Sequence, residues 1–303
     1  MSRLNQKRSE RVAGPCVGAP PRPPAGQFLV SDGPFAETKE SLVARGVAKP
    51  GCYARVNGLR MYYEVHGAGR PLVLLHGAMA TIESSFGAVL SQLAKTRRVI
   101  AVEQQAHGRT ADIDRRLSID QMARDTAELL TRLDIRHADI FGFSMGGTVA
   151  LSLAAQHPGL ARRLALVSTS YGYELQASES EMRTAYQRLQ ASVLNEAPSR
   201  DPLAVRFRGI VSAAGPARMR RMGDLISSSP ELRLNDLRSI RAPTLIIGGE
   251  HGLVRCEHTR GMAETLPHAR LETIAGDDHD PSIIVRSASM IPAFLDARTP
   301  PAA

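Results

Sequence analysis

One serine, Ser144, stands in a sequence context that suits nucleophilic catalysis. It lies in the run Gly142-Phe143-Ser144-Met145-Gly146, between an apolar segment (138–141) that predicts a buried strand and a segment (148–157) that predicts a helix. The glycines at 142 and 146 leave room where a sharp turn crowds strand against helix. A serine at the tip of this turn lies at the helix N-terminus, where backbone N–H groups and the helix dipole favour developing negative charge. The run therefore predicts a nucleophile, which needs an imidazole elsewhere in the chain to take its proton.

Strands and helices alternate on both sides of this turn. An Asn57-Gly58 turn between two apolar runs predicts a β-hairpin over 53–66. Periodicity predicts further strands at 71–75, 98–102, 164–167, 244–247 and 270–274, and helices at 82–94, 118–133, 255–266 and 282–295. Such alternation predicts an α/β fold with a mostly parallel sheet, whose ligands bind at the carboxyl ends of the strands.

Two segments depart from the alternation. Residues from about 171 to 238 are polar and helix-prone and are interpreted as an inserted cap. Residues 1–49 combine a Pro-rich tail, for which we expect disorder, with the run Phe28-Leu29-Val30-Ser31-Asp32-Gly33-Pro34-Phe35. That run resembles the signature of the small DGPF (YCII-related) family, but it covers only a fragment of such a domain. The predicted organisation is thus a tail over 1–49 and one catalytic domain over 50–303.

The sharp turn at Ser144 (a nucleophile elbow), the hairpin and the element order together resemble the α/β-hydrolase superfamily over about residues 53–297. Within it, the chain is most similar to small bacterial serine hydrolases of the esterase type, which combine a His-Gly turn with a Gly-Phe-Ser-Met-Gly-Gly elbow. The resemblance implies an α/β-hydrolase fold, with a mostly parallel central sheet flanked by helices and an inserted helical cap. It also implies that His279, in the loop after the last strand, is the base that activates Ser144.

The same resemblance implies an oxyanion hole formed by the backbone N–H groups of Met145 and Ala78. Ala78 directly follows the His76-Gly77 turn at the end of a predicted strand. His76 is expected to hold this turn through hydrogen bonds rather than to transfer protons.

The acidic partner of the histidine is where the chain departs from the superfamily pattern. An aspartate is usual a few residues after the 244–247 strand, but the run here is Gly249-Glu250-His251-Gly252, with glycine at the expected place. Glu250 is the nearest carboxylate and is our candidate. Asp277 and Asp278 adjoin His279, yet we expect either to need an unusual bend to reach its Nδ1 atom. The absence of any acid is the remaining alternative.

Composition narrows the partners and cofactors. The formal net charge is +8, but the basic residues are scattered without interleaved aromatic residues, which argues against nucleic acid. We find neither an apolar run of membrane-spanning length nor a signal-peptide core, so we expect a cytoplasmic protein without membrane contact. Three widely spaced cysteines predict neither a metal site nor a disulfide framework, and no cofactor is expected. No sequence feature indicates the oligomeric state.

These features predict a serine hydrolase that cleaves a small carboxylic ester through an acyl-enzyme on Ser144, slowly if the acid is missing. One alternative is a carbon–carbon bond hydrolase of ring-cleavage products, because Ser-Met-Gly-Gly elbows also occur in that branch. The other is a catalytically impaired α/β-hydrolase that holds a ligand in its capped pocket.

Overall fold

The computed structural model describes residues 51–171, 221, 225, 232–280 and 282–297. The Pro-rich tail and the DGPF-like fragment (1–49) lie outside the described residues, as does most of the predicted cap (171–238). Both therefore stay predictions.

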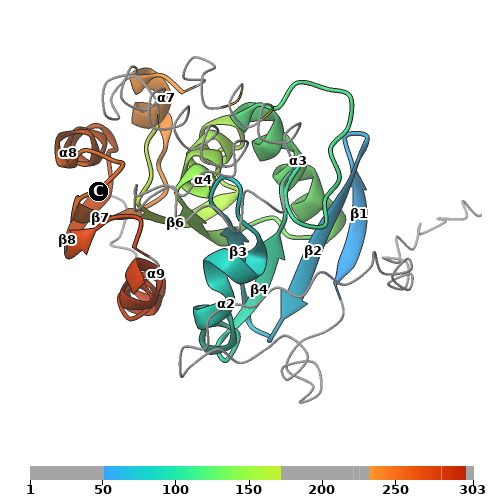
Figure 1. Ribbon diagram of the computed structural model, residues 1–303, viewed down its shortest axis with the longest axis horizontal. Coiled ribbons are helices and arrows are strands. Elements are labelled where there is room, and N and C mark those ends of the chain that lie inside the picture. Colours follow the sequence, from blue (N-terminus) through green and yellow to red (C-terminus); the bar gives the residue numbers. More distant parts are fainter. Residues whose placement is uncertain (1–50, 172–220, 222–224, 226–231, 281, 298–303) are drawn as a thin grey trace, which may run out of the picture.

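A twisted sheet of eight strands forms the centre of the described part (Figure 1). The strands follow the spatial order β1-β2-β4-β3-β5-β6-β7-β8. The first two pairings, β1 with β2 and β2 with β4, are antiparallel, and every pairing from β4 to β8 is parallel. The strands are β1 (Cys52–Val56), β2 (Leu59–His66), β3 (Arg70–Leu75), β4 (Arg97–Val102), β5 (Ala138–Phe143), β6 (Ala161–Val167), β7 (Thr244–His251) and β8 (Ala269–Asp277).

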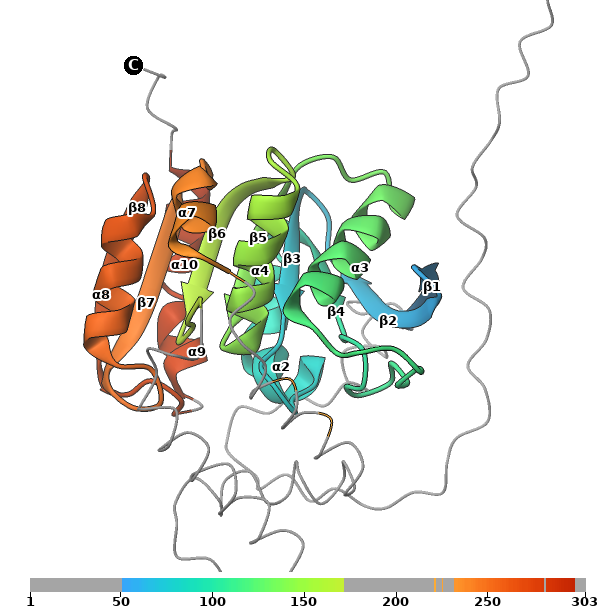
Figure 2. The same ribbon diagram turned by 90° about the horizontal axis from the view of Figure 1, so that it is seen from above.

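Helices cover both faces of the sheet. Figure 2 shows α3, α4 and α8 on one face, and α2, α9 and α10 on the other. The helices are α2 (Ile82–Leu93), α3 (Ile119–Arg132), α4 (Met145–Gln156), α7 (Leu234–Ser239), α8 (Cys256–Thr265), α9 (Ser282–Ser287) and α10 (Ile291–Asp296). Helix α3 begins as its sequence predicts, because the Ser118 side chain accepts a hydrogen bond from the backbone N–H of Gln121. The arrangement confirms the predicted α/β-hydrolase fold.

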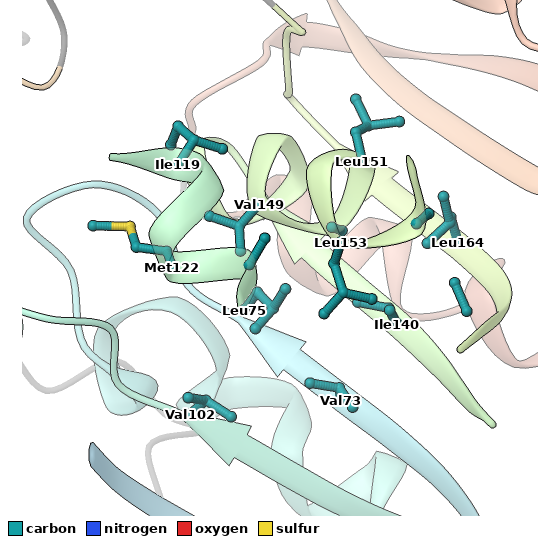
Figure 3. Close-up of a cluster of buried hydrophobic side chains, with 14 of the residues drawn as sticks. Val73, Leu75, Val102, Ile119, Met122, Ile140, Val149, Leu151, Leu153 and Leu164 are labelled. Atoms are coloured by element: carbon teal, nitrogen blue, oxygen red, sulfur yellow. The ribbon is translucent and has the colours of Figure 1, made fainter. Parts of the chain in front are cut away.

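The two faces of the sheet bury two separate apolar clusters, because side chains alternate along each strand. Val73 and Leu75 of β3 lie in the cluster beneath α3 and α4, together with Val149 of α4 (Figure 3). Leu72 and Leu74, one residue earlier in each case, lie in the cluster that includes Phe86 of α2 and Ile283 of α9. Burial on both faces explains why the parallel strands read as continuous apolar runs.

The hairpin between β1 and β2 follows the sequence prediction. Asn57 and Gly58 both have positive φ, 46° and 83°, as a two-residue hairpin turn with Asn-Gly requires. The Asn57 side chain also donates a hydrogen bond to Asp125 of α3 (3.0 Å), which ties the hairpin to the helix layer.

The C-terminal part of the fold corrects two predictions. The single closing helix predicted over 282–295 is two short helices, α9 and α10, with Pro292 in the first turn of α10. Proline has no N–H to donate to the carbonyl of residue 288, so one continuous helix would lose that hydrogen bond. Strands β7 and β8 also extend beyond their predicted ends, to His251 and Asp277.

The cysteines supply a further correction. Cys52 is disulfide-bonded, contrary to the expectation from cysteine spacing, whereas Cys256 is a free thiol. Among the described helices, none is both long enough and apolar enough to span a membrane.

Candidate active site

Ser144 occupies the turn between β5 and α4, at the carboxyl edge of the sheet. Its backbone has φ 51° and ψ −123°, a conformation that residues with a Cβ rarely adopt. Hydrogen bonds hold it there: its N–H donates to the Val167 carbonyl (2.9 Å), and the Thr169 hydroxyl donates to its carbonyl (2.6 Å). The serine is thus presented at a helix N-terminus by a strained turn that is anchored to β6.

Glycines make this turn sterically feasible, as the sequence predicts. A Cβ at Gly142 would lie 2.5 Å from the Gly146 carbonyl oxygen, and a Cβ at Gly146 would lie 2.0 Å from the carbonyl oxygen of Leu75. Both contacts are with backbone atoms, which cannot move without separating strand from helix. At a third glycine, Gly147, a Cβ would meet a side chain: it would lie 2.3 Å from the Thr169 hydroxyl oxygen, which is held by its hydrogen bond to the Ser144 carbonyl.

The structure brings His279 to Ser144, as predicted. The Ser144 hydroxyl lies 3.0 Å from His279 Nε2, although the two residues are 135 positions apart. His279 is 8% exposed, and the ring of Phe143 lies 5.5 Å from its own ring between centroids. Because Nδ1 faces a carboxylate, Nδ1 carries the ring proton and Nε2 is left to accept from the serine hydroxyl.

The carboxylate at Nδ1 belongs to Asp278. Its Oδ1 lies 2.7 Å from His279 Nδ1, and the side chain is 1% exposed. Our candidate, Glu250, lies elsewhere: it is exposed, and its carboxylate accepts a hydrogen bond from the Gly276 N–H (3.2 Å). The geometry therefore replaces Glu250 with Asp278 as the partner of the histidine.

The bend that lets Asp278 reach its neighbour is present, and it is anchored. Gly276, at the end of β8, has φ 97°, which favours glycine. Beyond it, the Asp278 N–H donates to the His251 carbonyl (2.8 Å), and the Ser168 hydroxyl donates to the Asp278 carbonyl. Sequence reasoning named Asp278 but preferred Glu250, because the bend was not expected. The available signal was the glycine-rich end of β7, where a Cβ at Gly249 would lie 2.5 Å from the Asp278 backbone nitrogen.

The His76-Gly77 turn lies against the nucleophile. A Cβ at Gly77 would lie 3.4 Å from the Ser144 Cβ. Within the described residues, neither the Ala78 N–H nor the Met145 N–H donates a hydrogen bond to another protein group. The residues expected to form an oxyanion hole thus have uncommitted backbone donors, and they directly follow Gly77 and Ser144, which approach each other.

His76 has the hydrogen bonds of a structural residue. Its Nε2 accepts from the Gln104 N–H (3.1 Å), so its Nδ1 carries the proton and donates to the Gly77 carbonyl (2.7 Å). Complete burial lowers the pKa of His76. A neutral imidazole thus fixes the turn that carries Ala78, in line with the role expected from the sequence.

The described residues hold no group of three or more His, Cys, Asp or Glu side chains arranged to bind a metal ion. The arrangement of Ser144, His279 and Asp278 allows acyl transfer, in which an imidazole held by a carboxylate takes the proton of the serine hydroxyl.

Comparison with known proteins agrees with this fold. A model of the alpha/beta hydrolase fold family matches residues 70–199. Among curated proteins, the chain is 27% identical over 261 residues to a 2-hydroxymuconate semialdehyde hydrolase from Pseudomonas sp. (strain CF600), a match that covers 78% of this chain and 91% of that protein.

Solved structures show the same fold. An N-acyl homoserine lactone degrading enzyme, Est816, matches with a TM-score of 0.67 and 21% identity, over 80% of this chain and 99% of its own. The enol-lactonase from Burkholderia xenovorans LB400 matches with a TM-score of 0.65 and 22% identity, over 80% of this chain and 98% of its own. At this level of identity, the likeness concerns the fold.

Proposed function

We propose that this member of the α/β-hydrolase superfamily is a serine hydrolase that cleaves small carboxylic esters through an acyl-enzyme on Ser144. The observation that carries the proposal is the hydrogen-bonded chain from the Ser144 hydroxyl through the His279 ring to the Asp278 carboxylate. These three hydrogen-bonded residues lie at the carboxyl edge of the sheet. The uncommitted backbone N–H groups of Ala78 and Met145 belong to the residues that follow Gly77 and Ser144.

In the first half of the reaction, the Ser144 oxygen bonds to the ester carbonyl carbon while its proton passes to His279 Nε2. The carbonyl oxygen takes the negative charge and is held by the N–H groups of Ala78 and Met145. When the carbonyl re-forms, the carbon–oxygen bond of the ester breaks, and the leaving alkoxide takes the proton from His279. The products are a free alcohol and an acylated Ser144.

In the second half, water attacks the acyl-enzyme and gives a proton to His279 Nε2. The bond to Ser144 then breaks, the proton returns to the serine oxygen, and a carboxylic acid leaves. Asp278 touches the imidazole throughout, because a charged ring with two N–H donors keeps its Nδ1 bond to the carboxylate.

The similarity to a 2-hydroxymuconate semialdehyde hydrolase favours a second candidate, hydrolysis of a carbon–carbon bond in ring-cleavage products. The same serine and histidine would serve that reaction. The third reading from the sequence, a catalytically impaired ligand-binding protein, was motivated by the absence of an acid from its usual place. The Asp278 carboxylate at Nδ1 removes that motive.

The test is hydrolysis of p-nitrophenyl acetate and butyrate by the purified full chain, with Ser144→Ala beside it. We expect the variant to lose at least about 10³-fold in kcat/KM, because the covalent route is gone. Mass spectrometry after treatment with a fluorophosphonate should place the adduct on Ser144. Equal ester turnover by both proteins would overturn the proposal, and turnover of a vinylogous diketone without ester turnover would establish the second candidate.

A further inference from the structure

The Asp278 carboxylate is held by two loops rather than by the histidine alone. Its Oδ1 accepts hydrogen bonds from the backbone N–H of Leu253 (2.9 Å) and from His279 Nδ1 (2.7 Å). Its Oδ2 accepts from the backbone N–H of Val254 (2.9 Å). Two of the three donors therefore come from the loop that follows β7, which forms a preorganised binding place for a carboxylate.

Gly252, the first residue of that loop, has no side chain, and the Asp278 carboxylate occupies the space where a Cβ would lie. An ideal Cβ on Gly252 would lie 1.8 Å from Asp278 Oδ1 and 2.5 Å from its Cγ, far inside van der Waals contact. Positive φ by itself does not produce this overlap. Gly58 and Gly159 also have positive φ, but a Cβ on either would meet nothing within 4 Å.

We infer that positions 252 and 278 share one carboxylate site on His279, which a side chain from either position can fill but not both. Asp278 reaches Nδ1 only because residue 252 is a glycine. Conversely, a side chain that starts 1.8 Å from the present Oδ1 enters the same place from the opposite loop. The inference rests on the proposed function, because its main readout is Ser144-dependent hydrolysis.

The decisive experiment is a double-mutant cycle on that hydrolysis. Asp278→Gly should lower kcat by about 10³ to 10⁴-fold, since the imidazole loses the group that sets its tautomer and orientation. Gly252→Ala should also lower kcat, because its methyl group displaces the carboxylate. In the Asp278→Gly background, Gly252→Ala should cost much less, since no carboxylate is left to displace and only the backbone nitrogen of residue 278, 2.9 Å from the ideal Cβ, and the backbone strain at φ 138° remain.

Gly159→Ala is the control for backbone strain. Gly159 also has positive φ (88°), and its Cβ would meet nothing within 4 Å. Any loss from Gly159→Ala should be equal with and without Asp278. If Gly252→Ala leaves kcat unchanged, or costs the same in both backgrounds, the shared site is refuted.

Restoring a carboxylate tests the site directly. Sodium formate should raise kcat of the Asp278→Gly variant, where sodium chloride at equal ionic strength does not. Gly252→Asp combined with Asp278→Gly should exceed Asp278→Gly alone by about tenfold or more, a partial recovery of the lost factor. Circular dichroism selects the folded variants. Failure of both rescues would refute the inference, even if the alanine cycle were coupled.

A second readout separates this inference from the proposed function. A hydrogen bond of 2.7 Å between His279 Nδ1 and a carboxylate should give a low-field proton resonance in the NMR spectrum. That resonance should vanish in Asp278→Asn and in Gly252→Ala, and persist in Ser144→Ala. If it behaves so in a protein without hydrolase activity, the proposed function fails while the shared site stands.

Discussion

Replacing Ser144 with glycine should abolish catalysis and stabilise the protein relative to the alanine variant. The backbone at 144 has φ 51° and ψ −123°, and four hydrogen bonds prevent it from relaxing. The Ser144 N–H donates to the Val167 carbonyl, and the Ser144 carbonyl accepts from the Thr169 hydroxyl and from the N–H groups of Gly147 and Thr148. Alanine keeps the Cβ and hence the strain, whereas glycine adopts positive φ without steric cost.

The expected magnitude follows from two opposing terms. A non-glycine residue in a sparsely populated region costs about 1–3 kcal/mol of folded-state strain. Glycine gives back about 0.4–1 kcal/mol, because it makes the unfolded chain more flexible. The net result is that Ser144→Gly should have a free energy of unfolding roughly 1 kcal/mol higher than that of Ser144→Ala. In a domain of this size, that difference raises the melting temperature by about 2–4 °C.

The assay is urea denaturation of the two variants, followed by circular dichroism, with a matched pair at Arg124. Arg124 is an exposed residue inside α3, where glycine should be about 1 kcal/mol less stable than alanine. The sign of the glycine-minus-alanine difference should therefore reverse between the two positions. If Ser144→Gly is as unstable relative to its alanine counterpart as Arg124→Gly is, the turn stores no strain and the reasoning fails.

Two further predictions concern residues near the catalytic loops. Burial lowers the pKa of His258 to about 4, and neither ring nitrogen has a hydrogen-bond partner in the described structure. The stability that comes from keeping this ring neutral is complete above the unfolded-state pKa of about 6.5 and is lost as pH falls toward 4, by about 2 kcal/mol at pH 5. His258→Phe keeps an aromatic ring against Tyr171 and should reduce the change in urea midpoint between pH 7.5 and 5.0. An unchanged pH dependence would show that the buried His258 ring is not its source. Glu250→Gln should leave kcat within about twofold, because an amide oxygen can still accept a hydrogen bond from the Gly276 N–H. Removing the charge of the carboxylate that holds a catalytic histidine costs about 10⁴-fold in kcat, and a loss of that size in Glu250→Gln would identify Glu250 as the acid.

Much of the fold follows from local sequence patterns, as does Ser144; His279 follows from the superfamily resemblance, and the third residue of the hydrogen-bonded chain does not follow from the sequence. The turn at Ser144 is readable because the strand, the small residues and the helix that make it are neighbours in the chain. The alternation of strands and helices is readable because burial imposes fixed periods on each segment. The closing helix was overextended because its apolar pattern continues through Pro292, and periodicity alone carries no information on a missing N–H.

The acid could not be obtained in this way. The sequence by itself determined which side chains are chemically suited to the site: one serine in a strained turn, a histidine after the last strand, and several carboxylates around them. Only the tertiary structure decided that Asp278, rather than Glu250, reaches His279, because that depends on how closely the ends of β7 and β8 approach. Their approach is set by glycines whose missing side chains leave space for a neighbouring loop, and a residue pattern within one segment does not specify what lies across that space.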